Sequence, residues 1–245
     1  MKKTSLFFFI ILLANCALSQ NLADSSSSFI LKRYYEATGR LENWKNVKSR
    51  IDTISYVGLE NQSEKVSKEN FYGKKSKVIN IYQDSLFYCE MYIERDENAQ
   101  FGYNGKQYWY ASDGGMNFNL PKDQSEFIME LTKVGEPLKI ETAQNAIYQG
   151  EKQINGETYH AILCSYRFVS NQIYLFEKDS YLLAYSHLEH APDKITKYED
   201  YKNIDGLLIS TKTITHDSGI LVGTTIYEKV LLNQKIFALR IFERL

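Results

Sequence analysis

Four histidines and several clustered carboxylates are the side chains of this sequence that could take part in chemistry. His187, Glu189 and His190 lie close enough along the chain to offer two imidazoles and a carboxylate to a metal ion. The segment is expected to run from a strand into a loop that Pro192 ends, however, and the sequence indicates no further ligand. We therefore interpret these residues as a solvated loop, and we expect no metal and no other cofactor.

Covalent catalysis is not indicated either. Cys164 and His160 stand four residues apart on one expected strand, about 13 Å from each other, which is too far for a nucleophile and its base. The sequence lacks the motifs typical of serine hydrolases, zinc proteases and phosphate-binding loops. Carboxylates gather at residues 94–97 and 199–200, among polar neighbours that suit a solvated surface. We predict a binding protein rather than an enzyme, although a glycosidase-like carboxylate pair stays open as an alternative.

The element that organises the chain is residues 197–233, which predict three consecutive antiparallel strands. Asp205-Gly206 and Ser218-Gly219 supply the positive φ angles of tight hairpin turns between runs rich in β-branched and aromatic residues. Apolar residues occupy both alternating faces of the last strand. This pattern suits a sheet that curls, with its concave face covered or holding an apolar ligand.

Further strands are predicted from residues 48–59 to residues 181–188, including a hairpin that turns at Asn155-Gly156. We predict a mainly β fold: an incomplete, strongly curved antiparallel barrel of about ten or eleven strands.

Two helices are expected to cover the open side of this barrel. The first spans residues 29–38, with Ser28 as its N-cap and Gly39 as its stop, and a short turn anchored by Trp44 follows. The second is inserted between strands at residues 121–134 and should end at Gly135.

The N-terminus is typical of a targeting segment. Lys2 and Lys3 precede an apolar stretch, residues 6–14, which is too short to cross a bilayer as a helix. A cleavage site of the small-x-small type makes residues 1–19 a signal peptide and residues 20–245 a single domain. A second interpretation places a lipid on Cys16, because residues 13–16 resemble a loose lipobox. Both interpretations predict export to the periplasm.

The composition limits the possible partners. The formal net charge of −1 argues against nucleic acid, which would need a basic surface, and 44% hydrophobic residues allow a sizeable core. Cleavage of the signal peptide leaves two cysteines, Cys89 and Cys164. They are interpreted as small buried hydrophobic residues, with a disulfide as the alternative in an oxidising compartment.

Several stretches resemble the exported LolA-like proteins, a family named for sorting lipoproteins to the outer membrane. Residues 34–49 (YYEATG, then WKNVKS) resemble the opening of these proteins, and residues 103–109 (YNGKQYW) resemble their aromatic hairpin. Residues 154–162 are similar to their central hairpin, and residues 176–183 and 197–208 to their later strands. The order and spacing of these stretches, over nearly all of residues 20–245, carry the resemblance.

The resemblance implies a periplasmic carrier that holds the acyl chains of a lipoprotein or lipid in an apolar cavity, for transfer toward the outer membrane. Its partners would be these acyl chains and an envelope receptor or membrane surface. The alternative is an envelope sensor or scaffold that binds a partner protein with the same fold. Each candidate lipid-binding residue could equally belong to the core; the candidates are Phe87, Met91, Trp109, Phe127, Leu131, Ile162, Phe168 and Phe176.

Overall fold

The computed structural model describes residues 26–58, 75–83, 86–93, 97–103, 108–112, 115–117, 134–167 and 169–234. Its strands are β1 (Ser49–Gly58), β2 (Lys75–Gln83), β3 (Leu86–Ile93), β4 (Glu97–Tyr103), β5 (Tyr108–Ser112), β6 (Gly115–Asn117), β7 (Asn145–Ile154), β8 (Glu157–Ser165), β9 (Gln172–Glu177), β10 (Leu183–Leu188), β11 (Ala191–Ile204), β12 (Leu207–Asp217) and β13 (Ile220–Leu232).

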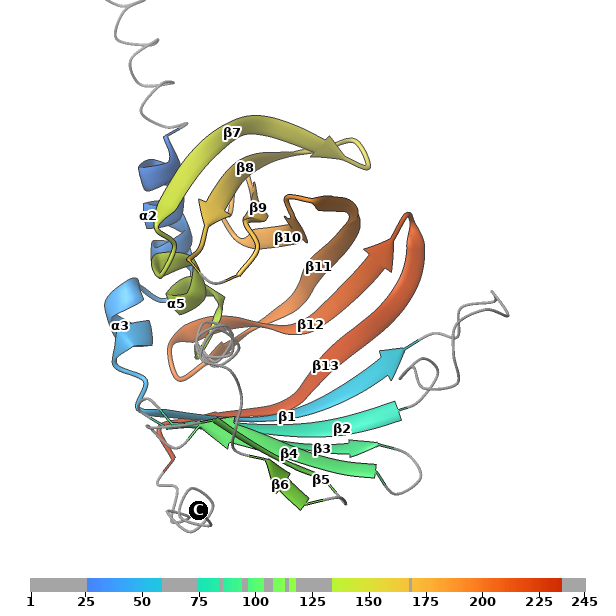
Figure 1. The fold of residues 1–245 in the computed structure, drawn as a ribbon. Coiled ribbons are helices and arrows are strands. Elements are labelled where there is room, and N and C mark those ends of the chain that lie inside the picture. Colours follow the sequence, from blue (N-terminus) through green and yellow to red (C-terminus); the bar gives the residue numbers. More distant parts are fainter. Residues whose placement is uncertain are drawn as a thin grey trace, which may run out of the picture.

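These strands form one sheet of thirteen, in the order β6-β5-β4-β3-β2-β1-β13-β12-β11-β10-β9-β8-β7. Two meanders, β1–β6 and β7–β13, meet where the first strand pairs antiparallel with the last. The edge strands β6 and β7 both come from the middle of the chain. The sheet bends so that β7 to β12 stand above the layer made by β1 to β6 (Figure 1).

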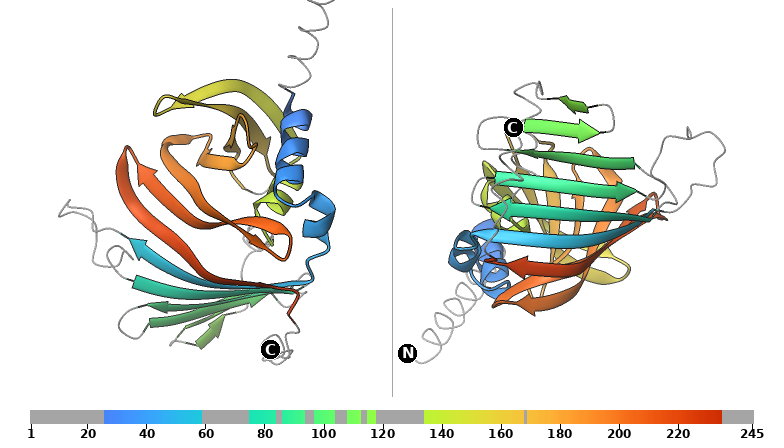
Figure 2. Two further views of the ribbon diagram at one scale, coloured as in Figure 1. Left: turned by 180° about the vertical axis from the view of Figure 1, so that it is seen from behind. Right: turned by 90° about the horizontal axis from the view of Figure 1, so that it is seen from below.

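Three short helices gather at one end of this sheet: α2 (Ser27–Ala37), α3 (Leu41–Lys45) and α5 (Glu136–Glu141). Figure 2 shows them on the same side of the molecule when it is seen from behind and from below. The side chain of Ser26, rather than that of Ser28, caps α2 by accepting a hydrogen bond from the backbone N–H of Phe29 at 3.2 Å. None of the helices in the described ranges is long and apolar enough to span a membrane.

The prediction of a mainly β, single antiparallel sheet with a few helices is confirmed, and the sheet is open rather than closed. The described residues form thirteen strands, where about ten or eleven were predicted. Most of the predicted helix 121–134 lies outside the described residues. Gly135, predicted to end that helix, is instead the N-cap residue of α5, so the helical turn follows this glycine.

The hairpin turns agree with the sequence. Both residues of Asn155-Gly156 have positive φ angles, 52° and 87°, and those of Asp205-Gly206 are 51° and 85°. Positive φ at both central residues is the geometry of a type I′ turn, which matches the twist of the flanking strands. Local turn chemistry therefore fixes the register of the meander.

The core between the helices and the sheet centres on α2. Ile30 and Tyr34 are buried in one cluster with Ile162 of β8 and with Tyr174 and Phe176 of β9. A second cluster lies on the opposite face of the β1–β5 layer and includes Ile81, Tyr88 and Trp109. The two clusters use opposite faces because side chains alternate along each strand.

Gly39 links α2 to α3 and packs against the turn between β11 and β12, at a place where no side chain fits. Its φ is +103°, and an added Cβ would lie 2.4 Å from the carbonyl oxygen of Gly206. Gly39→Ala is expected to lower the free energy of unfolding by about 2–3 kcal/mol, since it adds left-handed strain and a backbone clash. Gly206→Ala is the matched control, because Gly206 also has a positive φ (+85°) but nothing lies within 4 Å. Urea unfolding should show a smaller loss for Gly206→Ala, and equal losses would contradict the close approach.

Candidate functional site

A cavity of about 260 Å³ lies between the helices and the sheet, and we call it the inner cavity. The helices contribute Tyr34 and Trp44 together with residues of the α5 segment, and the sheet contributes residues of β1, β2 and β11 to β13. Its lining is Tyr34, Trp44, Arg50, Asp52, Tyr82, Gly135, Glu136, Pro137, Lys139, Thr196, Tyr198, Tyr201, Leu208, Ile209, Ser210, Thr213 and Tyr227. The lining is rich in hydroxyl groups and charges rather than in alkyl groups.

Arg50 and Asp52 form a buried ion pair on β1. Their side chains are 6% and 2% exposed, and Nε of Arg50 donates to Oδ1 of Asp52 at 2.8 Å. Burial alone would lower the pKa of Arg50, but Asp52 outweighs this effect and raises it. Burial raises the pKa of Asp52, while Arg50 opposes the rise. The guanidinium also lies 5.7 Å from the ring centroid of Tyr227, and its Nη1 donates to the carbonyl of Val134.

Tyrosine hydroxyls take part in a hydrogen-bond network on the sheet face under the helices. The hydroxyls of Tyr166 and Tyr174 lie 2.9 Å apart, and Tyr174 donates to Oε1 of Gln172 at 2.9 Å. Nε2 of Gln172 donates to Ser186 Oγ, which lies 3.1 Å from the hydroxyl of Tyr198. Burial raises the pKa of Tyr198 well above its ordinary value, so this hydroxyl stays protonated. The network thus runs from Tyr166, just after β8, to Tyr198 on the wall of the inner cavity.

Glu136, the first residue of α5, brings a carboxylate to this wall. Its Oε2 is buried, yet no described residue donates a hydrogen bond to it. Lys139 Nζ, one helical turn later, is 3.9 Å away, which is too long for a hydrogen bond. The negative charge of Glu136 adds to burial in raising the pKa values of Tyr34 and Tyr198.

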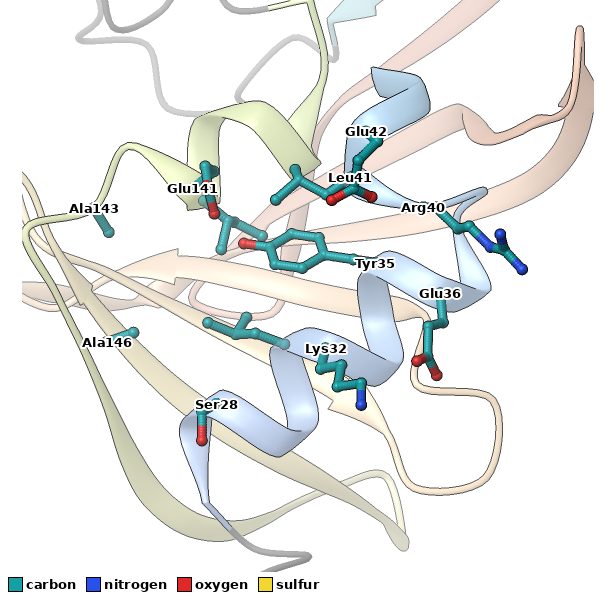
Figure 3. A pocket seen from close by; sticks show the side chains of 12 residues that line it. Ser28, Lys32, Tyr35, Glu36, Arg40, Leu41, Glu42, Glu141, Ala143 and Ala146 are labelled. Carbon is teal, nitrogen blue, oxygen red and sulfur yellow. The ribbon is translucent and has the colours of Figure 1, made fainter. Parts of the chain in front are cut away.

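An outer groove of about 820 Å³ lies on the other side of α5, between α2, α3 and the start of β7 (Figure 3). Tyr35 reaches across it from α2 toward Glu141. Leu31, Leu41 and Ile140 contribute its apolar surface. α5 therefore separates two different surfaces, with Glu136 and Lys139 on the inner cavity and Ile140 and Glu141 on the groove.

The structure places the candidate lipid-binding residues in three different surroundings. Ile162 and Phe176 lie together, fully buried under α2. Phe87 pairs across the strands with Tyr82, which lines the inner cavity, and the two rings are 5.1 Å apart. Trp109 lies on the opposite face of the sheet, beside Tyr88. Phe127, Leu131, Phe168 and the side chain of Met91 lie outside the described part, so the lipid-binding role of all eight stays a prediction.

The charged residues of the inner cavity were missed from the sequence. Arg50 and Asp52 stand at alternate positions of a strand whose other residues include Ile51 and Ile54, so they share one face with the buried Ile54. Two opposite charges at this spacing in an apolar strand are a usable signal for a buried pair. No such pattern marks Glu136 in the sequence, and the helix α5 that carries it was not predicted.

The cysteines, His160 and Glu199, which the sequence offers as candidates for chemistry, take part in packing or in surface ion pairs. Cys89 and Cys164 are free, buried thiols, as the simpler interpretation predicted, and burial raises the pKa of each to about 12. His160 stacks on the ring of Tyr181, with centroids 5.9 Å apart. Glu199 pairs with two lysines on the sheet surface, at 2.7 and 2.9 Å. Among the described residues, no group of three histidine, cysteine or carboxylate side chains could hold a metal ion.

An open antiparallel sheet with short helices over one end defines a known class of fold. A LolA superfamily protein from Nitrosomonas europaea is similar with a TM-score of 0.54 at 12% identity, covering 85% of this chain and 94% of that one. A domain from Vibrio parahaemolyticus named for outer membrane lipoprotein sorting matches with a TM-score of 0.54 at 11% identity, over 87% and 96% of the two chains. A DUF1329 family protein from Desulfovibrio piger gives 0.51 at 13% identity, over 84% and 94%.

The resemblance to LolA-like proteins predicted from the sequence is therefore confirmed at the level of the fold. No protein-family model matches the sequence, and no curated protein matches it either. At identities of 11–13% the solved structures show a shared fold alone.

Proposed function

We propose that this protein is an exported carrier that binds the acyl chains of a lipoprotein or lipid between its sheet and its helices and takes them across the periplasm toward the outer membrane. The observation that carries the proposal is the inner cavity, which lies between the three helices and the sheet in a LolA-like fold. We propose that it acts by binding alone, without catalysis.

Short helices over the cavity suit reversible entry. α3 has five residues and α5 has six, and the segment before α5 is tied to β1 by the hydrogen bond from Arg50 Nη1 to the carbonyl of Val134. The pair between Lys45 and Glu141, which links α3 to α5, is about half exposed and contributes little to stability. Moving α5 would open the inner cavity, at the cost of the packing of Ile140, which is 2% exposed and belongs to the core cluster under α2.

The hydroxyl-lined cavity and the acyl chains have different chemistry, so the chains need a continuation beyond it. Tyr82 lines the cavity, and Phe87 directly beside it is 6% exposed. An acyl chain that runs from Tyr82 over Phe87 would gain about 0.8 kcal/mol for each buried CH₂ group. Of the eight candidate residues, Phe87 is thus the best placed to contact an acyl chain. The proposal assumes that the sheet forms a strongly curved half-barrel around this chain.

A sensor or scaffold that binds a partner protein is the second candidate, and the outer groove favours it. The groove combines apolar Leu31, Leu41 and Ile140 with charged Lys32 and Glu42 at its margins, a mixture typical of protein interfaces. A lipid on Cys16 would also favour this candidate, since an anchored protein does not cross the periplasm.

Native mass spectrometry of the protein purified from a periplasmic extract tests the proposal. The expected result is a set of adducts of lipid mass that disappear when the same sample is denatured, because the ligand is held without a covalent bond. The denatured mass also shows whether the mature chain begins at Gln20 or carries a lipid on Cys16. An apo mass that stays unchanged after incubation with lipid vesicles and lipoprotein would overturn the carrier and favour the scaffold.

A further inference from the structure

The carboxylate of Glu136 has a buried oxygen atom, Oε2, without a hydrogen-bond donor among the described residues. Its side chain is 32% exposed, but Oε2 itself is buried, and no donor among the described residues reaches this oxygen. A carboxylate oxygen withdrawn from water without a hydrogen bond is costly, so such groups call for an explanation. A ligand that brings a donor into the inner cavity would supply the missing bond.

The charges around this oxygen limit what the ligand can be. The lining holds Arg50 and Lys139 with positive charge, and Asp52 and Glu136 with negative charge. Arg50 and Asp52 satisfy each other at 2.8 Å, whereas Glu136 and Lys139 remain 3.9 Å apart. A simple cation would meet Lys139 and Arg50, and a simple anion would meet Glu136 and Asp52. A zwitterionic ligand can pair its positive group with Glu136 and its negative group with Lys139, and it leaves the net charge of the cavity at zero.

The tyrosines favour an ammonium as the positive part. Tyr34, Tyr198, Tyr201 and Tyr227 all line the cavity that Glu136 faces, and aromatic rings attract cations through their faces. Oε2 needs a hydrogen-bond donor, which a primary ammonium has and a trimethylammonium lacks.

We propose that the inner cavity binds a zwitterionic head group, with a primary ammonium on Glu136 among the tyrosines and an anionic phosphate on Lys139. The inference rests on the proposed carrier function and names the polar end of its ligand, while the acyl chains leave past Tyr82 and Phe87. The same chemistry occurs in a phospholipid and in a free phosphate ester of ethanolamine.

Calorimetric titration with three dihexanoyl phospholipids below their micelle concentrations tests the head group. The ethanolamine lipid should bind about tenfold more tightly than the choline or glycerol lipid, because it alone satisfies Glu136 with a charged hydrogen bond. Glu136→Gln should remove this preference. Glu141→Gln is the matched control, since Glu141 is on the same helix but faces the outer groove, and it should keep the preference. Thermal melts establish that both variants fold.

The outcomes separate the two proposals. Equal binding of the three lipids, or an equal loss for all three in Glu136→Gln, would overturn the head-group site but leave the carrier intact. Binding of none of them would overturn both. Glycerophosphoethanolamine, which has no acyl chain, distinguishes the sources: weaker binding than the lipid supports a lipid head group, and equal binding would overturn the lipid in favour of a free zwitterion.

Discussion

Replacing Asp52 with alanine is expected to lower the free energy of unfolding by about 3–5 kcal/mol. The change leaves the guanidinium of Arg50 in a place where its side chain is only 6% exposed, without the carboxylate that now lies 2.8 Å away. Arginine does not lose its proton in a protein, so the charge stays. Urea unfolding followed by tryptophan fluorescence measures the loss, since Trp44 lines the same cavity.

Glu141→Ala is the matched control for this substitution. Glu141 also pairs with a cation at 2.8 Å, but the side chains of Lys45 and Glu141 are 51% and 40% exposed. Its loss should stay below about 1 kcal/mol, because solvent already screens an exposed pair. A loss for Asp52→Ala no larger than the control would contradict a desolvated ion pair.

Removing both charges together shows whether the loss of stability in Asp52→Ala comes from an unpaired buried charge or from the loss of the ion pair itself. The double replacement of Arg50 by methionine and Asp52 by valine should recover most of the stability, because apolar side chains of similar size can replace a buried pair without net loss. It also removes the hydrogen bond from Arg50 to Val134. A double variant that is stable but releases lipid faster would support the proposed role of this bond in holding the α5 segment over the cavity.

The part of the fold that could be predicted is the part set by local chemistry. Asn155-Gly156 and Asp205-Gly206 require positive φ angles, and both turns occur where the sequence puts them. Alternation along residues 197–233 likewise predicts β11 to β13. The pairing of β1 with β13 depends on contacts between distant segments, which no local pattern contains. The start of α5 after Gly135 depends on packing too: an added Cβ there would lie 2.4 Å from the ring of Trp44.

The site was harder to predict than the fold because polar and aromatic side chains, rather than alkyl ones, make up most of its lining. A buried face is recognised from sequence by its alkyl and aromatic side chains, and tyrosine counts as either core or surface. Here Tyr34, Tyr82 and Tyr227 are neither simple core nor surface, since each lines a cavity that also holds charges. Which of the 19 tyrosines do so depends on where the helices sit over the sheet.

Shortening Phe176 to alanine is also expected to lower the free energy of unfolding by about 3–5 kcal/mol. The side chain is fully buried, and its ring centroid lies 5.0 Å from that of Tyr34 on α2 and 6.5 Å from that of Tyr174. The void would open between α2 and the sheet, within the cluster that also includes Ile162 and Leu183. Cys164→Ala, which removes one sulfur atom from the same fully buried cluster, is the control and should cost clearly less.

The same variant separates a core role of Phe176 from its predicted contact with an acyl chain. Phe176 packs under α2, whereas Phe87 lies beside the cavity-lining Tyr82, so we expect Phe87→Ala to weaken lipid binding more than Phe176→Ala does. Native mass spectrometry with lipid, well below both unfolding transitions, compares the two. Lipid retained by folded Phe176→Ala and lost from Phe87→Ala would put the acyl chain along β2 and β3. Truncation of a residue that only packs the core lowers stability without removing a contact to the ligand. Equal losses of lipid from both folded variants would therefore mean that the acyl chain also reaches Phe176 on β9.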